Sequence, residues 1–231
     1  MKVFAVVPAR SGSKGLPDKN IRVLGDHELM VHSIRFAQAL GVDAVICSTD
    51  SPRYAEIAEL AGAHALGLRS PEASSDTAME PAVLDDVRAK LQHSTFGIPD
   101  IIVWLRPTFV FRSIQAVQAC IDDVRSGRGT SSRVVTEEDP RVYKAVNGRL
   151  QPGFETGPAS MVRRQDMPGP LYRVYSADVF PTPNDPCPQD FLGDDVRFNI
   201  APKICGLDID DFDDFQLVDA MLERIGSAIL D

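Results

Sequence analysis

Three short runs of consecutive apolar residues most limit how this chain can fold. Each run is four or five residues long, too short for a helix, and polar or turn-forming residues follow it. Such runs are typical of parallel strands that are buried on both faces of a sheet. The predicted strands are Val3–Val7, Ala44–Cys47 and Ile101–Leu105.

Segments with helical spacing of apolar residues lie between and after these runs. Asp76 and Ser113 are expected to cap two of the helices. The alternation predicts an α/β fold, a mostly parallel sheet with helices on both faces, and ligands at the carboxyl ends of its strands. The predicted helices are His27–Leu40, Pro52–Ala61, Asp76–Gln92 and Ile114–Arg125.

The pattern changes after Val135. Residues Val142–Leu150 predict two short strands around Asn147-Gly148, a pair typical of a type I′ hairpin, and a proline-rich segment follows. A strand at Lys203–Asp208 and a helix at Phe212–Ile225 then restore regular structure. We assign the helix stripe of Leu217, Met221 and Ile225 to the core, and expect one domain with an inserted hairpin arm.

Charge and composition exclude several classes of protein. The 231 residues contain 24 Lys and Arg against 33 Asp and Glu, a net charge of −9, which argues against nucleic-acid or anionic-membrane binding. No apolar run approaches the roughly 18 residues of a membrane span, and the four cysteines lack zinc-site spacing. We therefore expect a cytoplasmic protein with reduced thiols, whose phosphate chemistry needs a local cluster of cations.

The loop after the first strand has such a cluster. Four cations lie within thirteen residues, and two glycines allow the backbone to approach a ligand closely. The loop matches neither GxxxxGK[ST] nor GxGxxG, so we interpret it as a different polyphosphate cradle. The alternative is a solvated loop with accidental charge. The cations are Arg10, Lys14, Lys19 and Arg22.

Two aspartates at the end of the predicted strand at 203–208 form the second chemical feature. In extended backbone Asp208 and Asp210 point to one side, and Mg²⁺ prefers one or two carboxylates together with phosphate and water oxygens. This spacing predicts a metal site. Asp211, Asp213 and Asp214 instead suit the first turn of a helix.

These motifs occur in the order found in one enzyme family. The chain resembles the acylneuraminate cytidylyltransferases over nearly its whole length, and the combination of its N-terminal and late motifs is specific. The resemblance rests on the segments 5–20 (AVVPARSGSKGLPDKN), 48–50 (STD), 105–108 (LRPT), 163–168 (RRQDMP) and 207–211 (LDIDD), with Arg69 and Arg112.

The resemblance implies a Rossmann-like fold, with residues 1–231 as a single nucleotidyltransferase domain and an inserted arm at about 137–185 through which a homodimer forms. It implies transfer of the cytidylyl group of CTP to the anomeric hydroxyl of a 2-keto-3-deoxy sugar acid, such as sialic acid or a related nonulosonic acid. Pyrophosphate is released, and Mg²⁺ is required.

The resemblance also suggests roles for particular residues. Arg10, Lys14 and Lys19 would hold the triphosphate and act in catalysis. Asp208 and Asp210 would bind the metal; Asp208 or a water molecule could take the acceptor's proton. The other nucleotide-binding residues would be Ala9, Ser13, Asn20, Arg69 and Asp76, and those on the sugar side Arg106, Thr108, Arg112, Arg164 and Gln165.

The chain departs from the family pattern on the sugar side. Arg106 stands where the family often has Gln, and Glu80 lies near a position that is usually small and hydroxylated. A guanidinium at Arg106 would select an anionic acceptor group, because it can bind a carboxylate or phosphate with two hydrogen bonds. A nucleotidyltransferase for sugar 1-phosphates and a non-catalytic nucleotide-sugar-binding module remain alternatives.

Overall fold

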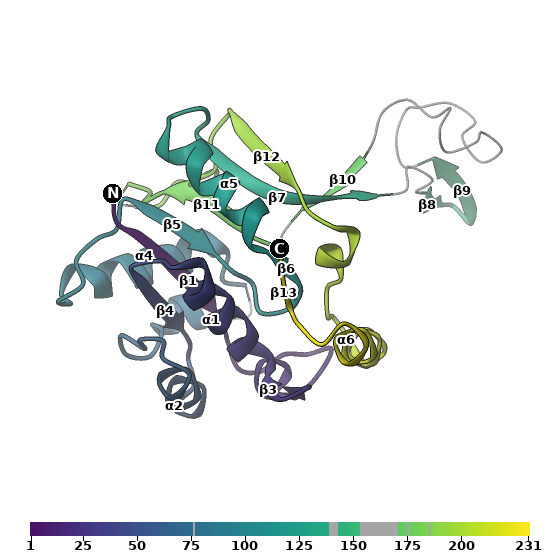
Figure 1. Cartoon of the computed structure of the whole chain (residues 1–231), viewed down its shortest axis with the longest axis horizontal. Helices are drawn as coiled ribbons and strands as arrows, with labels where there is room; N and C mark the ends of the chain where they lie inside the picture. Colours follow the sequence, from purple (N-terminus) through teal and green to yellow (C-terminus); the bar gives the residue numbers. More distant parts are fainter. Residues whose placement is uncertain (76, 139–142, 153–170, 175, 185) are drawn as a thin grey trace.

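A seven-stranded sheet forms the centre of the computed structural model, which describes all residues except 76, 139–142, 153–170, 175 and 185 (Figure 1). Five of the seven strands run in one direction, and β10 and β11 run against them. The order along the sheet is β10-β7-β11-β5-β1-β4, with β12 also paired to β7. The strands are β1 Val3–Pro8, β4 Ala44–Ser48, β5 Ile101–Trp104, β7 Ser131–Glu138, β10 Leu171–Arg173, β11 Asp178–Pro181 and β12 Val196–Ile200.

The three predicted apolar runs are β1, β4 and β5, side by side and parallel. All of their residues are buried except Pro8, which is partly exposed, because helices cover both faces of this part of the sheet. The prediction of an α/β fold with a mostly parallel sheet is confirmed. Its helices are α1 Leu29–Leu40, α2 Pro52–Leu60, α3 Pro71–Ser74, α4 Glu80–Gln92, α5 Ile114–Arg125 and α6 Phe212–Ile225.

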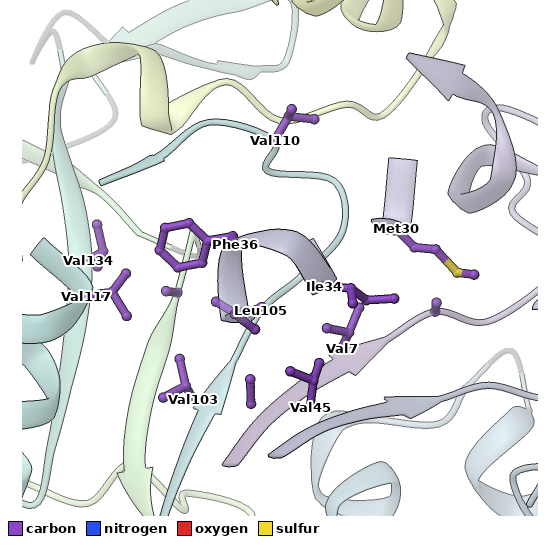
Figure 2. Close-up of a cluster of buried hydrophobic side chains, with 14 of the residues drawn as sticks. Val7, Met30, Ile34, Phe36, Val45, Val103, Leu105, Val110, Val117 and Val134 are labelled. Carbon is purple, nitrogen blue, oxygen red and sulfur yellow. The ribbon is translucent and has the colours of Figure 1, made fainter. Parts of the chain in front are cut away.

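The core has two layers, one on each face of the sheet. Side chains of α1 and α5, such as Phe36 and Val117, pack against Val7, Val103 and Val134 in the larger layer (Figure 2). The second layer packs α4 against the opposite face of β1 and β5. This burial provides most of the stabilisation of the sheet, at about 25 cal/mol per Å² of apolar surface.

Short elements complete the chain. The hairpin of β8 and β9 has Asn147 at φ 51° and Gly148 at φ 72°, which confirms the predicted type I′ turn, and it lies away from the main sheet (Figure 1). The helices in the described part of the chain are too short or too polar to cross a bilayer. The short elements are β2 Val23–Leu24, β3 His27–Glu28, β6 Arg112–Ser113, β8 Tyr143–Val146, β9 Arg149–Pro152, β13 Ile229–Leu230, and the 3₁₀ turns Lys19–Ile21 and Lys203–Gly206.

Several predicted boundaries are wrong. Helix α1 begins at Leu29, because His27–Glu28 pair with Val23–Leu24 as β3. Helix α4 begins at Glu80 instead of Asp76, with Pro81 in its first turn. Residues 203–208 form a 3₁₀ turn and one isolated bridge between Phe109 and Asp208, so the expected strand does not exist.

The predicted core face of α6 is correct for Met221, which packs partly buried against the core, and wrong for the other two residues of the stripe. Leu217 and Ile225 are 51% and 41% exposed, whereas Val218 and Leu222 point into the core. Helix α6 carries apolar residues on more than one face, so periodicity alone does not decide which face is buried. The docking of the helix against the rest of the fold decides it.

Candidate active site

A cleft of about 520 Å³ opens at the carboxyl ends of β1 and β5. Nine of the residues predicted for the site line it, although they come from four separate segments of the chain. A larger cavity, of about 610 Å³, lies between the β2–β3 turn and α6 and contains none of them. The nine are Arg10, Ser13, Lys14, Lys19, Asn20, Arg69, Arg106, Thr108 and Asp210.

The predicted cradle lies along one side of this cleft, and its shape is held by contacts from neighbouring segments. The Ser11 backbone N–H and hydroxyl both donate to the Asp50 carboxylate, at 2.7 and 3.0 Å. The Asn20 amide donates to the Arg10 carbonyl at 2.9 Å, and Leu16 is buried in the core. The loop is therefore ordered through its backbone, while Lys14 stays exposed.

The cradle meets the aspartate segment across the cleft. The Lys19 ammonium donates to the Ile209 carbonyl at 2.6 Å and lies 3.7 Å from the Asp210 carboxylate. A Cβ atom on Gly15 would lie 2.5 Å from the Asp210 carbonyl oxygen, so only glycine permits this approach. Two motifs about 190 residues apart in the sequence thus form one site.

The two aspartates have different environments. Asp208 is mostly buried, Asp210 is exposed, and the side chain of Ile209 between them points into the core. Burial raises the pKa of Asp208 and the nearby Asp210 charge raises it further, against the opposing effect of the Thr108 hydroxyl. The Oδ1 atom of Asp208 has no hydrogen-bond partner among the described residues.

This donor set fits a hard divalent cation. A buried carboxylate oxygen without a partner is costly, and a cation beside it would remove that cost. The described residues contain no group of three carboxylate, His or Cys ligands, so phosphate oxygens or water would have to complete the coordination.

Arg69 forms the wall of the cleft beside β4. Its guanidinium donates to the Ser48 hydroxyl and carbonyl, both at 2.8 Å. Burial lowers its pKa, and the nearby Asp50 carboxylate counteracts that effect. Ala9 is buried next to it, and its backbone N–H donates to the Ser48 carbonyl at 2.9 Å. Ala9 does not itself line the cleft, and its backbone joins the start of the cradle to β4.

Arg106 lies in the cleft, but neighbouring acids already match its charge. Its guanidinium donates to Glu80 at 2.8 and 2.9 Å and to Asp178 at 2.8 Å. Although burial disfavours the charge, these two carboxylates raise the pKa of Arg106. The guanidinium is not open to an anionic ligand in this arrangement.

Arg112 does not reach the cleft, and the prediction that it contacts the acceptor is wrong in this structure. The side chain is 1% exposed and packs over the Phe36 ring at 5.7 Å. It donates to the carbonyls of Ser176 and Arg106, at 3.1 and 2.5 Å. Arg112 stabilises the segment after β5 from inside the core. Asp76, Arg164 and Gln165 lie outside the described residues.

Three side chains at the site had no predicted role there. Glu80 lines the cleft, and the Trp104 indole donates to it at 3.0 Å. Arg173 on β10 lies 3.9 Å from the Asp208 carboxylate. The departure at Glu80 was visible in the sequence, but no local pattern relates Arg173 or the indole N–H to this cleft.

Comparisons with known proteins agree with this geometry. A model of the cytidylyltransferase family matches residues 4–145. The CMP-N,N'-diacetyllegionaminic acid synthase of Legionella pneumophila is 34% identical over 123 residues, which are 53% of each chain. The N-acylneuraminate cytidylyltransferase of Streptococcus agalactiae is 29% identical over 224 residues, 93% of this chain and 52% of that protein. The chain spans about half the length of these curated relatives.

A solved structure supports the fold. The CMP:2-keto-3-deoxy-manno-octonic acid synthetase in complex with CTP superposes with a TM-score of 0.70 at 17% identity, over 97% of this chain and all of that one.

Proposed function

This chain belongs to the cytidylyltransferase family, and on that premise we propose that it transfers the cytidylyl group of CTP to the anomeric hydroxyl of a 2-keto-3-deoxy sugar acid, with release of pyrophosphate. The observation that carries the proposal is the meeting of Lys19 with Ile209 and Asp210. It joins a cationic loop and a pair of carboxylates at the carboxyl ends of parallel strands, which is where α/β sheets bind their ligands.

The residues of the loop fit the charge that such a reaction develops. Displacement at the α-phosphorus places negative charge on the phosphoryl oxygens and on the departing pyrophosphate. Arg10, Lys14 and Lys19 line the cleft and would stabilise that charge. The reaction needs no side-chain nucleophile, and positioned cations supply most of the catalysis.

We propose Mg²⁺ as the cofactor, held by Asp208 and Asp210. When bound there, it would neutralise phosphate charge and orient the triphosphate. The proton of the acceptor hydroxyl would pass to Asp208 or to a water molecule.

The proposed acceptors are sialic, legionaminic and Kdo-type acids, the sugar acids in the names of the similar proteins. The alternative of a sugar 1-phosphate depended on an open guanidinium at Arg106. Because Glu80 and Asp178 already match that charge, the feature that supported this alternative is lost. A non-catalytic module would need no metal-binding carboxylates, so the paired aspartates favour an enzyme.

The homodimer remains a proposal of ours. Strand β12 lies at an edge of the sheet and exposes Val196, Phe198 and Ile200 from one face, with Tyr172 of β10 5.0 Å from the Phe198 ring. An apolar patch of this kind is a surface that a second copy would cover.

A screen for pyrophosphate release tests the activity. The four ribonucleoside triphosphates would be combined with sialic, legionaminic, pseudaminic and Kdo-type acids and with common sugar 1-phosphates, in the presence of Mg²⁺. We expect release only with CTP and one or more of the acids. Release with sugar 1-phosphates alone, or with no acceptor at all, would contradict the proposal.

A binding measurement tests the cradle. Calorimetry of Lys14→Ala should show CTP affinity about 10- to 150-fold weaker, because a charge-assisted hydrogen bond contributes roughly 1.5–3 kcal/mol. Arg53→Ala is the matched control, since Arg53 is an exposed cation on α2 that does not line the cleft. Equal CTP affinity in both variants would refute the cradle.

A further inference from the structure

The wall of the cleft opposite the cradle is formed by one hydrogen-bonded network of charges. Glu80 is the first residue of α4 and Arg106 follows β5. Asp178 begins β11 and is 1% exposed, and Arg133 of β7 donates to it at 2.6 and 3.0 Å. Among the described residues the order is Glu80, Arg106, Asp178 and Arg133, so their formal charges cancel, but the most exposed of these side chains in the cleft is an acid.

Glu80 and Arg106 both line the cleft, and Glu80 is the more exposed of the two. Its side chain is 38% exposed, whereas Arg106 and Arg133 are each 17% exposed. The Oε1 atom accepts from Arg106 and from the Trp104 indole, and Oε2 accepts from Arg106 at 2.9 Å. A carboxylate can accept about four hydrogen bonds, so the exposed side of the Glu80 carboxylate can still accept hydrogen bonds from a ligand.

The position of this carboxylate is well defined. Trp104 is 1% exposed and cannot move without disturbing the core, and the planar guanidinium of Arg106 is itself held by Asp178. These fixed donors hold the Glu80 carboxylate in place before any ligand binds, which reduces the conformational entropy lost on binding.

We propose that Glu80 determines acceptor specificity, by accepting hydrogen bonds from neutral hydroxyl or amide N–H groups of the sugar acid. The inference rests on the proposed function and reverses the role expected for Arg106. The wall selects a polyhydroxylated part of the acceptor and repels its anionic group, which therefore binds elsewhere in the cleft. A sugar that cannot donate a hydrogen bond to Glu80 leaves that carboxylate unpaired, and a sugar with an anionic group at this position is repelled. Both effects discriminate strongly between sugars.

Replacement of Glu80 by Gln tests the inference in the intact protein. Gln keeps the size of the side chain but turns one acceptor oxygen into a donor. In Glu80→Gln the Michaelis constant for the sugar acid should rise about 10- to 100-fold, as expected for loss of a charged hydrogen bond. That for CTP should change less than about twofold. Glu59→Gln removes the same charge from the exposed surface of α2 and is the control.

A double variant distinguishes direct recognition of the sugar acid by Glu80 from an indirect effect of Glu80 through Arg106. If Glu80 only neutralised Arg106, then Glu80→Gln combined with Arg106→Gln would restore the original Michaelis constant for the sugar acid, because the charges of the wall balance again. We expect no restoration. Recovery to within twofold of the original protein would overturn the inference.

The single tryptophan gives a readout that does not need turnover. Trp104 contacts Glu80, so a sugar acid added in the presence of CDP should change the indole fluorescence of the original protein and not that of Glu80→Gln. Equal titrations in the two proteins would overturn the inference. If the original protein binds the acid in this assay but releases no pyrophosphate, the proposed function fails while the inference stands. If it does not bind the acid, both fail.

Discussion

The two walls of the cleft carry charge in different ways. On the cradle side, Arg10, Lys14 and Lys19 lie within ten residues of one loop, and Lys14 is exposed. On the other side, Arg106 and Asp178 come from distant segments and are largely or fully buried. The charge of Lys14 can change with little effect on the core, whereas Asp178 is part of the core. The partners of the cations separate the two walls more clearly than exposure does. Lys19 is 13% and Arg106 17% exposed, but Arg106 is held by buried Asp178, whereas Lys19 meets a backbone carbonyl and an exposed carboxylate.

The strongest way to break this comparison is to remove Asp178. In Asp178→Ala, Arg106 loses one of the two carboxylates that it contacts in the described part of the chain, and the mostly buried Arg133 loses the acceptor of two hydrogen bonds. Because removal of one partner from a buried ion pair is costly, we expect about 3–5 kcal/mol less free energy of unfolding, measured by urea denaturation.

Asp190→Ala is the control for this variant, since Asp190 is exposed, and it should stay within about 0.5 kcal/mol of the original protein. If Asp178→Ala were as stable as this control, the second wall would not be part of the core in an energetic sense.

Asp208→Asn sharpens the comparison, because Asp208 is a proposed ligand of Mg²⁺ and is also mostly buried. We expect turnover to fall about 10- to 100-fold, as for other losses at a metal site. Stability should rise at neutral pH: burial raises the folded-state pKa of Asp208 above its unfolded value, so the ionised carboxylate destabilises the fold above that pKa. The gain should shrink as the pH falls through both pKa values, because the native carboxyl is then protonated in both states.

Thermal unfolding from pH 7 down to pH 3, with turnover at pH 7, would measure both effects. Asp213→Asn, in the first turn of α6, is the control and should keep normal turnover. A stability gain in Asp208→Asn that grew as the pH fell would contradict the explanation.

The smallest expected effect concerns support of the cradle. Asp50→Ala removes the acceptor of the Ser11 N–H and hydroxyl, so the loop should lose order, although its cations remain. We expect about 1 kcal/mol less stability and CTP affinity about fivefold weaker, by calorimetry. Asp26→Ala, at an exposed turn, should change neither quantity. Unchanged CTP affinity in Asp50→Ala would show that the loop holds its shape without this contact.

Features that depend on neighbouring residues were predictable from the sequence. The apolar runs became β1, β4 and β5, Ser113 caps α5 through the Ala116 N–H, and Asp211 and Asp214 form the capping box of α6. The Asn147-Gly148 turn has the expected positive φ angles. In each case a few adjacent side chains and the backbone determine the conformation, so a local pattern is sufficient.

Features that depend on how elements dock were not predictable in the same way. The periodicity of α6 suggested Leu217 and Ile225 for the core, but the fold buries Val218 and Leu222 instead. Likewise a buried position for Arg112 follows from the packing of α1 and the segment after β5, which no spacing records.

The sequence by itself determined the alternation of strands and helices, the cationic loop and the paired aspartates. Only the tertiary structure decided that Lys19 meets Asp210, that Glu80 holds Arg106, and which wall of the cleft has a neutralised guanidinium. The physical reason is the range of the interactions. Strand burial, caps and turns are set within a few residues, whereas ion pairs across a cleft require segments up to about 190 residues apart to be packed together first.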